Sequence, residues 1–443
     1  MTEINFQRAS AQIVATLTRI LGPRHIALAE EVAQDALLKA LETWPHAGVP
    51  LNPSAWLIQV AKNRALDVLR RERWLADRIA LVAVQLDSSG SPPSSVSPMT
   101  GGPPAPPSEH ARLRHEPVMP DDDQLWMMFL ACHPVLAREA RVALTLKTVC
   151  GFGVGEIARA FLVREDTIAQ RLVRAKRQLR DADVAFELAP AEYADRLESV
   201  LGVLYLLFNE GHSPHAGDEL IRVELCDEAI RLTRLIADEP TLATPAVHAL
   251  LALMHLQAAR LPARMGGEDV QRLPEQDRSR WDRALIARGL RDLDRSSAGD
   301  VLTVYHLEAG IAACHAVAPR YDDTDWSRIV EFYDLLAAIK PTPIVALNRA
   351  IALSRLHGPR AGLAAIEQIA DDPVLSRYYL LPATLGELAL ESGDVARAAD
   401  CFRAALECEC SRPERRSLER KLQQLLAEAP ADSRLPGTPQ RRP

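Results

Sequence analysis

Apolar residues recur every three or four positions along most of the chain, which is the spacing of one face of an α-helix. Few segments alternate apolar and polar residues with the period of two that a strand requires. The spacing therefore predicts an all-α protein. In the segment 27–44 the expected buried face is made of small, aliphatic and aromatic residues: Ala29, Val32, Ala36, Leu37, Ala40 and Trp44.

One segment cannot form a packed helix. Between residues 87 and 120 the chain has nine prolines, seven serines and three glycines among 34 residues, a composition typical of linkers. It separates two helical units and indicates a multidomain protein. We expect an N-terminal unit at 1–80, a linker at 81–120, a second unit at 121–185, a large helical extension at 186–430 and a disordered tail at 431–443.

A second amphipathic helix is expected from residue 55 onward, with Ser54 as its N-cap. Trp56, Leu57, Ala61 and Ala65 belong to its apolar stripe. The opposite side carries polar and basic groups: Lys62, Asn63, Arg64, Asp67, Arg70 and Arg71. Taken alone, the arginines at the end of this helix are explained by the negative end of the helix dipole, which favours cations.

The second unit contains the pattern of a helix-turn-helix. An apolar helix pair at 124–150 is followed by a short helix at 154–160, a turn at 161–164 and a longer helix at 165–181. The spacing of the apolar residues Ile157, Phe161, Ile168 and Leu172 predicts two helices that cross near a right angle. Six side chains on the longer helix and at its start are predicted to face outward: Arg164, Thr167, Gln170, Arg171, Arg174 and Arg177.

Charge supports a nucleic-acid surface at the same place. The chain as a whole has a net charge of −7, so a surface for phosphates must be local. Residues 159–180 carry seven Arg and Lys against two acids, a local net charge of +5. A basic stripe of this kind attracts DNA phosphates, and arginine also reads guanine in the major groove.

Both units resemble one protein family. WLIQVAKNRALDVLRRER at 56–73 looks like the promoter-melting helix of extracytoplasmic-function sigma factors, and EEVAQDALLKALETW at 30–44 resembles their helix that binds core RNA polymerase. The helix-turn-helix resembles sigma domain four, which reads the −35 element. One departure is Lys62, where the family usually has arginine.

The resemblance implies partners and site residues. The partners are core RNA polymerase and promoter DNA. Polymerase contacts are implied for Gln34, Asp35 and Lys39, and −10 contacts for Lys62, Asn63, Arg64, Asp67, Arg70 and Arg71. The loop 46–55 would hold a flipped base of the −10 element. Contacts with the −35 element are implied for Arg164, Thr167, Gln170, Arg171, Arg174 and Arg177.

The long extension identifies a subgroup. Its blocks resemble the sigma factors of this type that carry a fused tetratricopeptide-like domain. In its last part, a tetratricopeptide-like spacing is kept by Leu385, Gly386, Ala398, Phe402 and Ala405. The architecture suggests regulation in cis or a surface for a protein partner. Truncation after residue 185 is expected to change activity strongly, because apolar residues of the next helix would lose their packing partner: Leu197, Leu201, Leu204 and Leu207.

Other classes of function are weighed against this one. Three clusters of acids with His, Arg or Trp, near 209–218, 277–282 and 315–326, are interpreted as polar networks between helices, and we expect no enzyme activity, cofactor or metal site. Seven cysteines without a regular framework, and no long apolar run, predict a cytoplasmic protein outside the membrane. The alternatives are a one-component helix-turn-helix regulator with a ligand-sensing helical domain, and a helical-repeat scaffold or enzyme.

Overall fold

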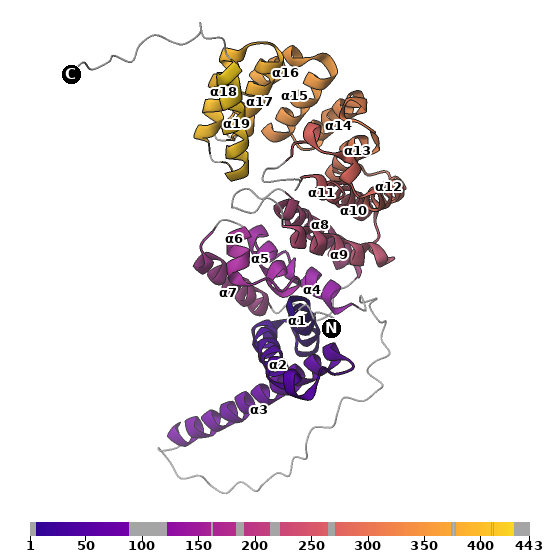
Figure 1. The fold of residues 1–443 in the computed structure, drawn as a ribbon. Helices are drawn as coiled ribbons and strands as arrows, with labels where there is room; N and C mark the ends of the chain where they lie inside the picture. The colour runs from indigo at the N-terminus through magenta and orange to yellow at the C-terminus, as the bar shows by residue number, and fades with distance from the viewer. Residues whose placement is uncertain are drawn as a thin grey trace, which may run out of the picture. The chain divides into compact units, whose positions relative to one another are not determined.

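The computed structural model describes residues 6–87, 122–160, 163–182, 190–212, 222–264, 271–373, 375, 378–408, 410 and 412–428. Within these ranges all regular secondary structure is α-helix or 3-10 helix, without strands, as predicted (Figure 1). The chain divides into two compact units, Met1–Val203 and Leu204–Pro443. Among the described helices, none combines the length and the apolar character that a membrane span needs.

The first part of unit 1 is a three-helix core. It is formed by α1 (Phe6–Leu21), a 3-10 turn η1 (Pro23–His25), α2 (Ile26–Ala47) and α3 (Pro53–Asp87). The face predicted for 27–44 is buried except at Leu37, which is half-buried. The rings of Trp44 and Trp56 meet at 5.5 Å between centroids, so they tie the end of α2 to the start of α3. Small residues at the centre of this core allow the helices to approach closely.

Two details at α3 differ from the sequence-based expectation. The cap is Asn52 and not Ser54, because the Asn52 side-chain oxygen accepts a hydrogen bond of 3.0 Å from the backbone N–H of Ala55. Pro53 then occupies the first helical position, where its missing N–H costs nothing. The helix also continues to Asp87, beyond the boundary expected at residue 80. Residues 88–121, most of the expected linker, lie outside the described residues.

The second part of unit 1 contains the expected helix pair and helix-turn-helix. Its helices are α4 (Asp123–Ala131), α5 (Arg138–Thr148), α6 (Val154–Ala160), α7 (Glu165–Asp181) and the first half of α8 (Pro190–His212). Every residue of α4 from Leu125 to Ala131 is buried. The Phe129 ring meets that of Tyr193 on α8 edge-on at 4.9 Å between centroids. The first half of α8 thus completes the core of unit 1.

Unit 2 begins with helices arranged around α10. They are α9 (Val223–Asp238), α10 (Pro245–Ala258), α11 (Leu261–Arg264), α12 (Arg283–Ser296) and α13 (Val304–Val317), with short 3-10 turns η3 (Leu273–Glu275) and η4 (Arg278–Arg280). Helix α10 packs against α9, α12 and α13. It is buried nearly all round, as expected for a helix whose side chains are mostly Ala, Leu and Met.

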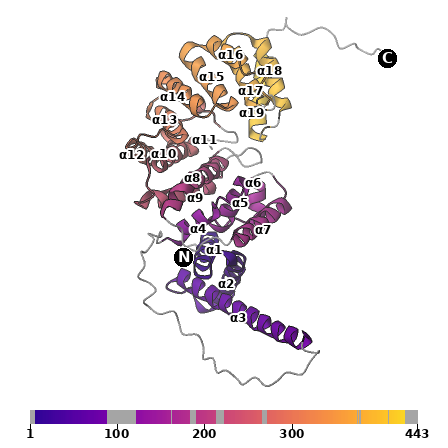
Figure 2. The same cartoon turned by 180° about the vertical axis from the view of Figure 1, so that it is seen from behind.

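The rest of unit 2 consists of helices that pack mainly against their neighbours in sequence. They are α14 (Trp326–Ile339), α15 (Pro343–His357), α16 (Pro359–Glu367), α17 (Leu380–Glu391), α18 (Val395–Glu407) and α19 (Arg412–Glu428), after the 3-10 turn η5 (Tyr321–Asp323). Both views show α17 beside α18 (Figures 1 and 2). Gly358 and Gly393 turn the chain between paired helices with φ near +88° and +84°, a conformation that glycine adopts without strain.

The α17–α18 pair depends on a glycine contact that the repeat pattern predicts. A Cβ atom on Gly386 would lie 2.8 Å from the ring of Phe402, which is fully buried. Alanine favours a helix by about 1 kcal/mol, but overpacking a core costs about 1–3 kcal/mol. We therefore expect Gly386→Ala to lower the midpoint of thermal unfolding, followed by far-ultraviolet circular dichroism.

The matched control is Gly202→Ala on α8. Gly202 is also inside a helix, but nothing lies within 4 Å of the Cβ position. This substitution is expected to raise the unfolding midpoint, because only the helix-propensity gain applies. A rise for both variants would contradict the proposed contact between Gly386 and Phe402.

Candidate nucleic-acid interface

The helix-turn-helix of α6 and α7 has the boundaries that the sequence predicts, although residues 161 and 162 of its turn lie outside the described residues. The backbone N–H of Val163 donates to the carbonyl of Ala158 at 3.1 Å, which closes the turn after α6. The inner face of the pair is apolar and buried: Ile157, Ile168, Leu172, Ala175 and Leu179. This packing fixes which side of α7 faces outward.

The predicted outward set on α7 is accessible. All of its members are exposed except Arg171, which is half-buried: Arg164, Thr167, Gln170, Arg171, Arg174 and Arg177. Arg164 pairs with Asp166 at 3.1 Å and Arg177 with Asp181 at 3.2 Å. Within the described part of the chain, neither Arg171 nor Arg174 has a carboxylate in ion-pair distance. These two guanidinium groups are therefore available to an external anion. That they contact DNA stays a prediction.

The predicted −10 set on α3 is exposed throughout: Lys62, Asn63, Arg64, Asp67, Arg70 and Arg71. Several of these side chains already have partners. The Asn63 side chain accepts from Gln59 at 3.0 Å, and Arg70 lies 3.8 Å from Asp67. These pairs are solvent-exposed and worth at most about 1 kcal/mol each. An external partner can therefore displace them at little cost.

One ion pair joins two residues for which the sequence implied different partners. Arg64 on α3 donates through Nε to Asp35 on α2 at 3.0 Å. The resemblance implied DNA for the arginine and polymerase for the aspartate. In this structure each side chain meets the other, so the two surfaces share an edge. The remaining predicted polymerase contacts, Gln34 and Lys39, are exposed on α2.

Two leucines on α2 were not among the predicted contacts. Leu38 is 60% exposed and Leu41 is 56% exposed. They follow Gln34 at helical spacing and lie away from the buried face of Ala36 and Ala40. Exposed leucines on one helix face are typical of a protein–protein contact. The signal was present in the sequence, because both residues fall outside the apolar stripe assigned to the core.

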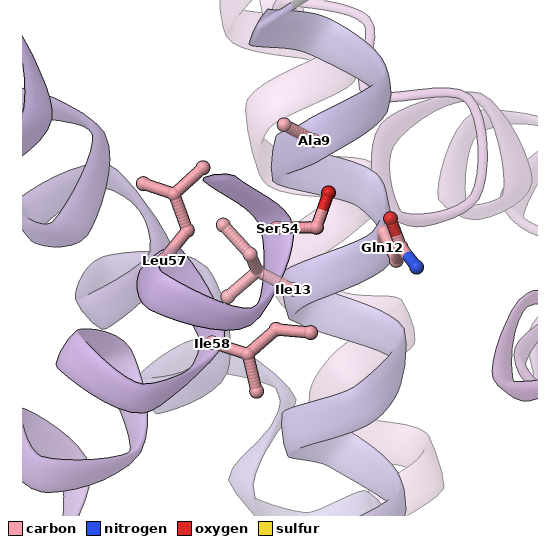
Figure 3. A pocket seen from close by; sticks show the side chains of 6 residues that line it. All are labelled: Ala9, Gln12, Ile13, Ser54, Leu57 and Ile58. Atoms are coloured by element: carbon pink, nitrogen blue, oxygen red, sulfur yellow. The ribbon is translucent and has the colours of Figure 1, made fainter. Parts of the chain in front are cut away.

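The loop between α2 and α3 is shorter than the segment 46–55, since α2 ends at Ala47 and α3 begins at Pro53. Beside it lies a shallow hollow between α1 and α3 that encloses no space for a water molecule (Figure 3). Its lining is mostly apolar: Ala9, Gln12, Ile13, Ser54, Leu57 and Ile58. Ligand pockets usually exceed about 300 Å³, so we do not assign a base-binding role to this hollow.

The parts of unit 1 that carry the two candidate DNA surfaces contact each other. Lys176 on α7 forms an ion pair with Glu30 on α2, and both side chains are largely buried. Asp123, at the start of α4, accepts from Arg19 at 2.8 Å and from Thr16 at 2.6 Å, both on α1. Helix α1 also packs against α4 and α5. In this structure these polar contacts and the packing of α1 hold together the two parts of unit 1 that carry the candidate DNA surfaces.

The three polar clusters of unit 2 join or cap helices. Asp282 accepts from two backbone N–H groups at the start of α12, and Asp325 accepts from the backbone N–H of Arg328 at the start of α14. Arg278 donates at 2.6 Å to the carbonyls of His315 and Ala318, which end α13. Asp218 of the first cluster lies outside the described residues. Among the residues that are described, no group of three His, Cys, Asp or Glu side chains has metal-site geometry.

His315 gives unit 2 a pH-dependent stability. The side chain is 8% exposed, and burial together with Arg260 and Arg278 lowers its pKa to about 3. The folded protein therefore keeps this imidazole neutral, whereas the unfolded chain takes up a proton below about pH 6.5. The stabilisation is complete above that pH and is lost as the pH falls toward 3. We expect about 1.4 kcal/mol of unfolding free energy to be lost per pH unit below pH 6.

Urea unfolding between pH 7 and pH 5 measures this effect. His315→Gln should remove about one proton from the dependence of stability on pH. His357→Gln, at an exposed position on α15, is the control for the removal of a histidine from unit 2. Equal slopes for His315→Gln and the unaltered chain would contradict the assignment.

Comparison with known families matches both parts of unit 1. Residues 6–75 match the family Sigma-70 region 2, and residues 126–179 match Sigma-70, region 4. Residues 196–297 match a family described only as of unknown function (DUF6596). The chain is 35% identical over 434 residues to the uncharacterized protein R00370 of Rhizobium meliloti (strain 1021), covering 95% of each chain. No solved structure matches the chain significantly.

Proposed function

Because this chain belongs to the extracytoplasmic-function sigma factors with a fused C-terminal domain, we propose that α2, α3 and α7 divide between them polymerase binding, −10 opening and −35 reading. The chain acts in transcription initiation. The observation that carries the finer assignment is the pair of exposed basic helices, α3 and α7, in one unit with an exposed leucine face on α2.

Each surface suits a different step. The α2 surface of Gln34, Leu38, Lys39 and Leu41 combines apolar and polar groups, which is typical of a protein interface. The α3 surface carries cations beside amide groups, as needed to hold strands that have separated. Helix α7 presents Arg171 and Arg174 from the second helix of a helix-turn-helix, the element that enters the major groove. The proposed roles therefore follow the chemistry that each helix exposes.

The fused unit 2 has a proposed regulatory or partner-binding role in the same reaction. It is joined to unit 1 by the continuous helix α8, whose first half belongs to the core of unit 1. Any change of conformation in unit 2 that moves α8 would alter that core. This continuity favours regulation in cis over a free-standing second function.

Run-off transcription with core RNA polymerase tests the proposal. The promoter fragment is first selected from a random-sequence library by the reconstituted holoenzyme. We expect a transcript from one start site that requires both the chain and the polymerase. A one-component regulator would instead bind the fragment tightly without polymerase in a gel shift. Tight binding alone, together with no holoenzyme, would contradict the sigma-factor assignment.

A further inference from the structure

Helix α12 and the turn before it carry an excess of positive charge that unit 1 does not account for. Residues 278–295 contain six arginines and three aspartates, a local net charge of +3 in a chain of −7. Asp292 is buried, Asp282 is the N-cap of the helix and Asp294 is exposed. Five of the arginines are exposed, and the four that form no ion pair with a described residue define what we call the α12 arginine face: Arg280, Arg283, Arg288 and Arg291.

Within the described part of the chain, none of these four arginines has a carboxylate within ion-pair distance. Arg280 is attracted at longer range by Asp277. Arg295, on the same helix, reaches Asp292 at 3.5 Å. Several exposed or half-buried arginines elsewhere in unit 2 have close acidic partners: Arg320 with Asp323, Arg328 with Glu331, Arg349 with Asp334, Arg355 with Glu391 and Arg403 with Asp400. Arg360 on α16 and Arg397 on α18 also form no ion pair with a described residue, but neither has a second such arginine beside it on its helix.

The α12 arginine face is unfavourable for the isolated chain. Arg288, Arg291 and Arg295 follow one another at i+3 and i+4, so their side chains lie side by side on the helix. Like charges at these spacings destabilise a helix by a few tenths of a kcal/mol per pair. The inner side of α12 packs on α10 through Ile286 and Gly289. The arginines therefore cannot rotate into the core, and an external polyanion would relieve their repulsion.

We propose that the α12 arginine face binds the phosphate backbone of promoter DNA, outside the segment that α7 reads. The proposal rests on the sigma-factor function, because that function brings unit 2 to DNA. Helix α8 joins the two units covalently. When unit 1 is bound to a promoter, this link holds unit 2 at high effective concentration near the duplex. Phosphate contacts do not depend on the base sequence, so the α12 arginine face increases the affinity for DNA without changing which promoter is chosen.

The test uses the full-length chain with Arg288→Ala and Arg291→Ala together. The control carries Arg360→Ala and Arg397→Ala, which remove the same charge from unit 2 at exposed helical positions. The first probe is a 30-base-pair duplex of arbitrary sequence, with affinity measured as a function of salt. Two lost phosphate contacts should reduce the slope of log affinity against log salt by about 1.8. Between 50 and 200 mM salt this corresponds to about a tenfold smaller loss of affinity.

The second measurement is a nuclease footprint of the holoenzyme on the selected promoter. We expect protection beyond the −35 element for the unaltered chain and the control, and its loss for the α12 variant with the start site unchanged. Equal salt slopes and equal footprints for all three proteins would overturn the proposal. So would an unchanged salt slope with weakened binding to core polymerase, which would assign the face to an acidic protein surface. Start-site-specific transcription by the variants shows separately whether the sigma-factor function holds.

Discussion

Replacing Arg171 and Arg174 by alanine is expected to abolish start-site-specific transcription while holoenzyme still forms. Both side chains lie on the outward face of α7, and within the described part of the chain neither has an acidic partner that would compete with DNA. An arginine that contacts a base edge is worth about 1–3 kcal/mol. Losing both should weaken promoter binding at least about 30-fold. Run-off transcription and a holoenzyme gel shift measure the two effects separately.

The control for this prediction is Arg180→Ala on the same helix. Arg180 is exposed and lies about half a turn away from Arg171 around the α7 axis. Its loss removes charge near the DNA but not from the reading face, so promoter choice should persist. Normal transcription by the Arg171 and Arg174 double variant would contradict the −35 role proposed for α7.

Truncation after residue 185 is expected to unfold unit 1. The first half of α8 supplies four buried apolar side chains to that unit: Tyr193, Leu197, Val200 and Leu201. Ser199 also accepts from Arg141 on α5 at 2.5 Å. Burial of such side chains contributes about 1.5–3 kcal/mol each, so the loss is about 6–12 kcal/mol. This is as large as the whole stability of a typical domain.

A chain that ends at Val203 is the matched comparison. It keeps the half of α8 that packs on α4 and α5 and removes all of unit 2. We expect it to remain folded in circular dichroism and to bind core polymerase, whereas the chain ending at 185 aggregates. If both truncated chains proved equally soluble and active, α8 would not be part of the unit 1 core.

The helix-turn-helix could be predicted almost residue by residue because its buried face repeats with the helical period. Other features depend on pairing between distant segments, which periodicity does not report. Arg64 meets Asp35 across 29 residues, and Lys176 meets Glu30 across 146. The exposure of Leu38 is different, because its position outside the predicted apolar stripe of α2 could be seen in the sequence.

The prediction that Ser54 caps α3 was wrong for a different reason. Asn52 and Ser54 are both good capping residues, so residue type alone does not choose between them. Pro53 decides, because proline favours the first helical position and the cap must then be the residue before it. The position of Pro53 is visible in the sequence and predicts Asn52 as the cap.

The contact between Lys176 and Glu30 has a mechanical consequence for promoter binding. Elements named −35 and −10 lie about 25 base pairs apart, or about 85 Å of duplex. If α3 and α7 read the two elements at once, as proposed above, α7 must leave α2 while residues 88–121 keep the two parts of unit 1 joined. These 34 residues extend to at most about 115 Å, which exceeds the distance between the elements by about 30 Å. On this proposal, the length of the segment sets an upper limit to the spacer that a promoter can have.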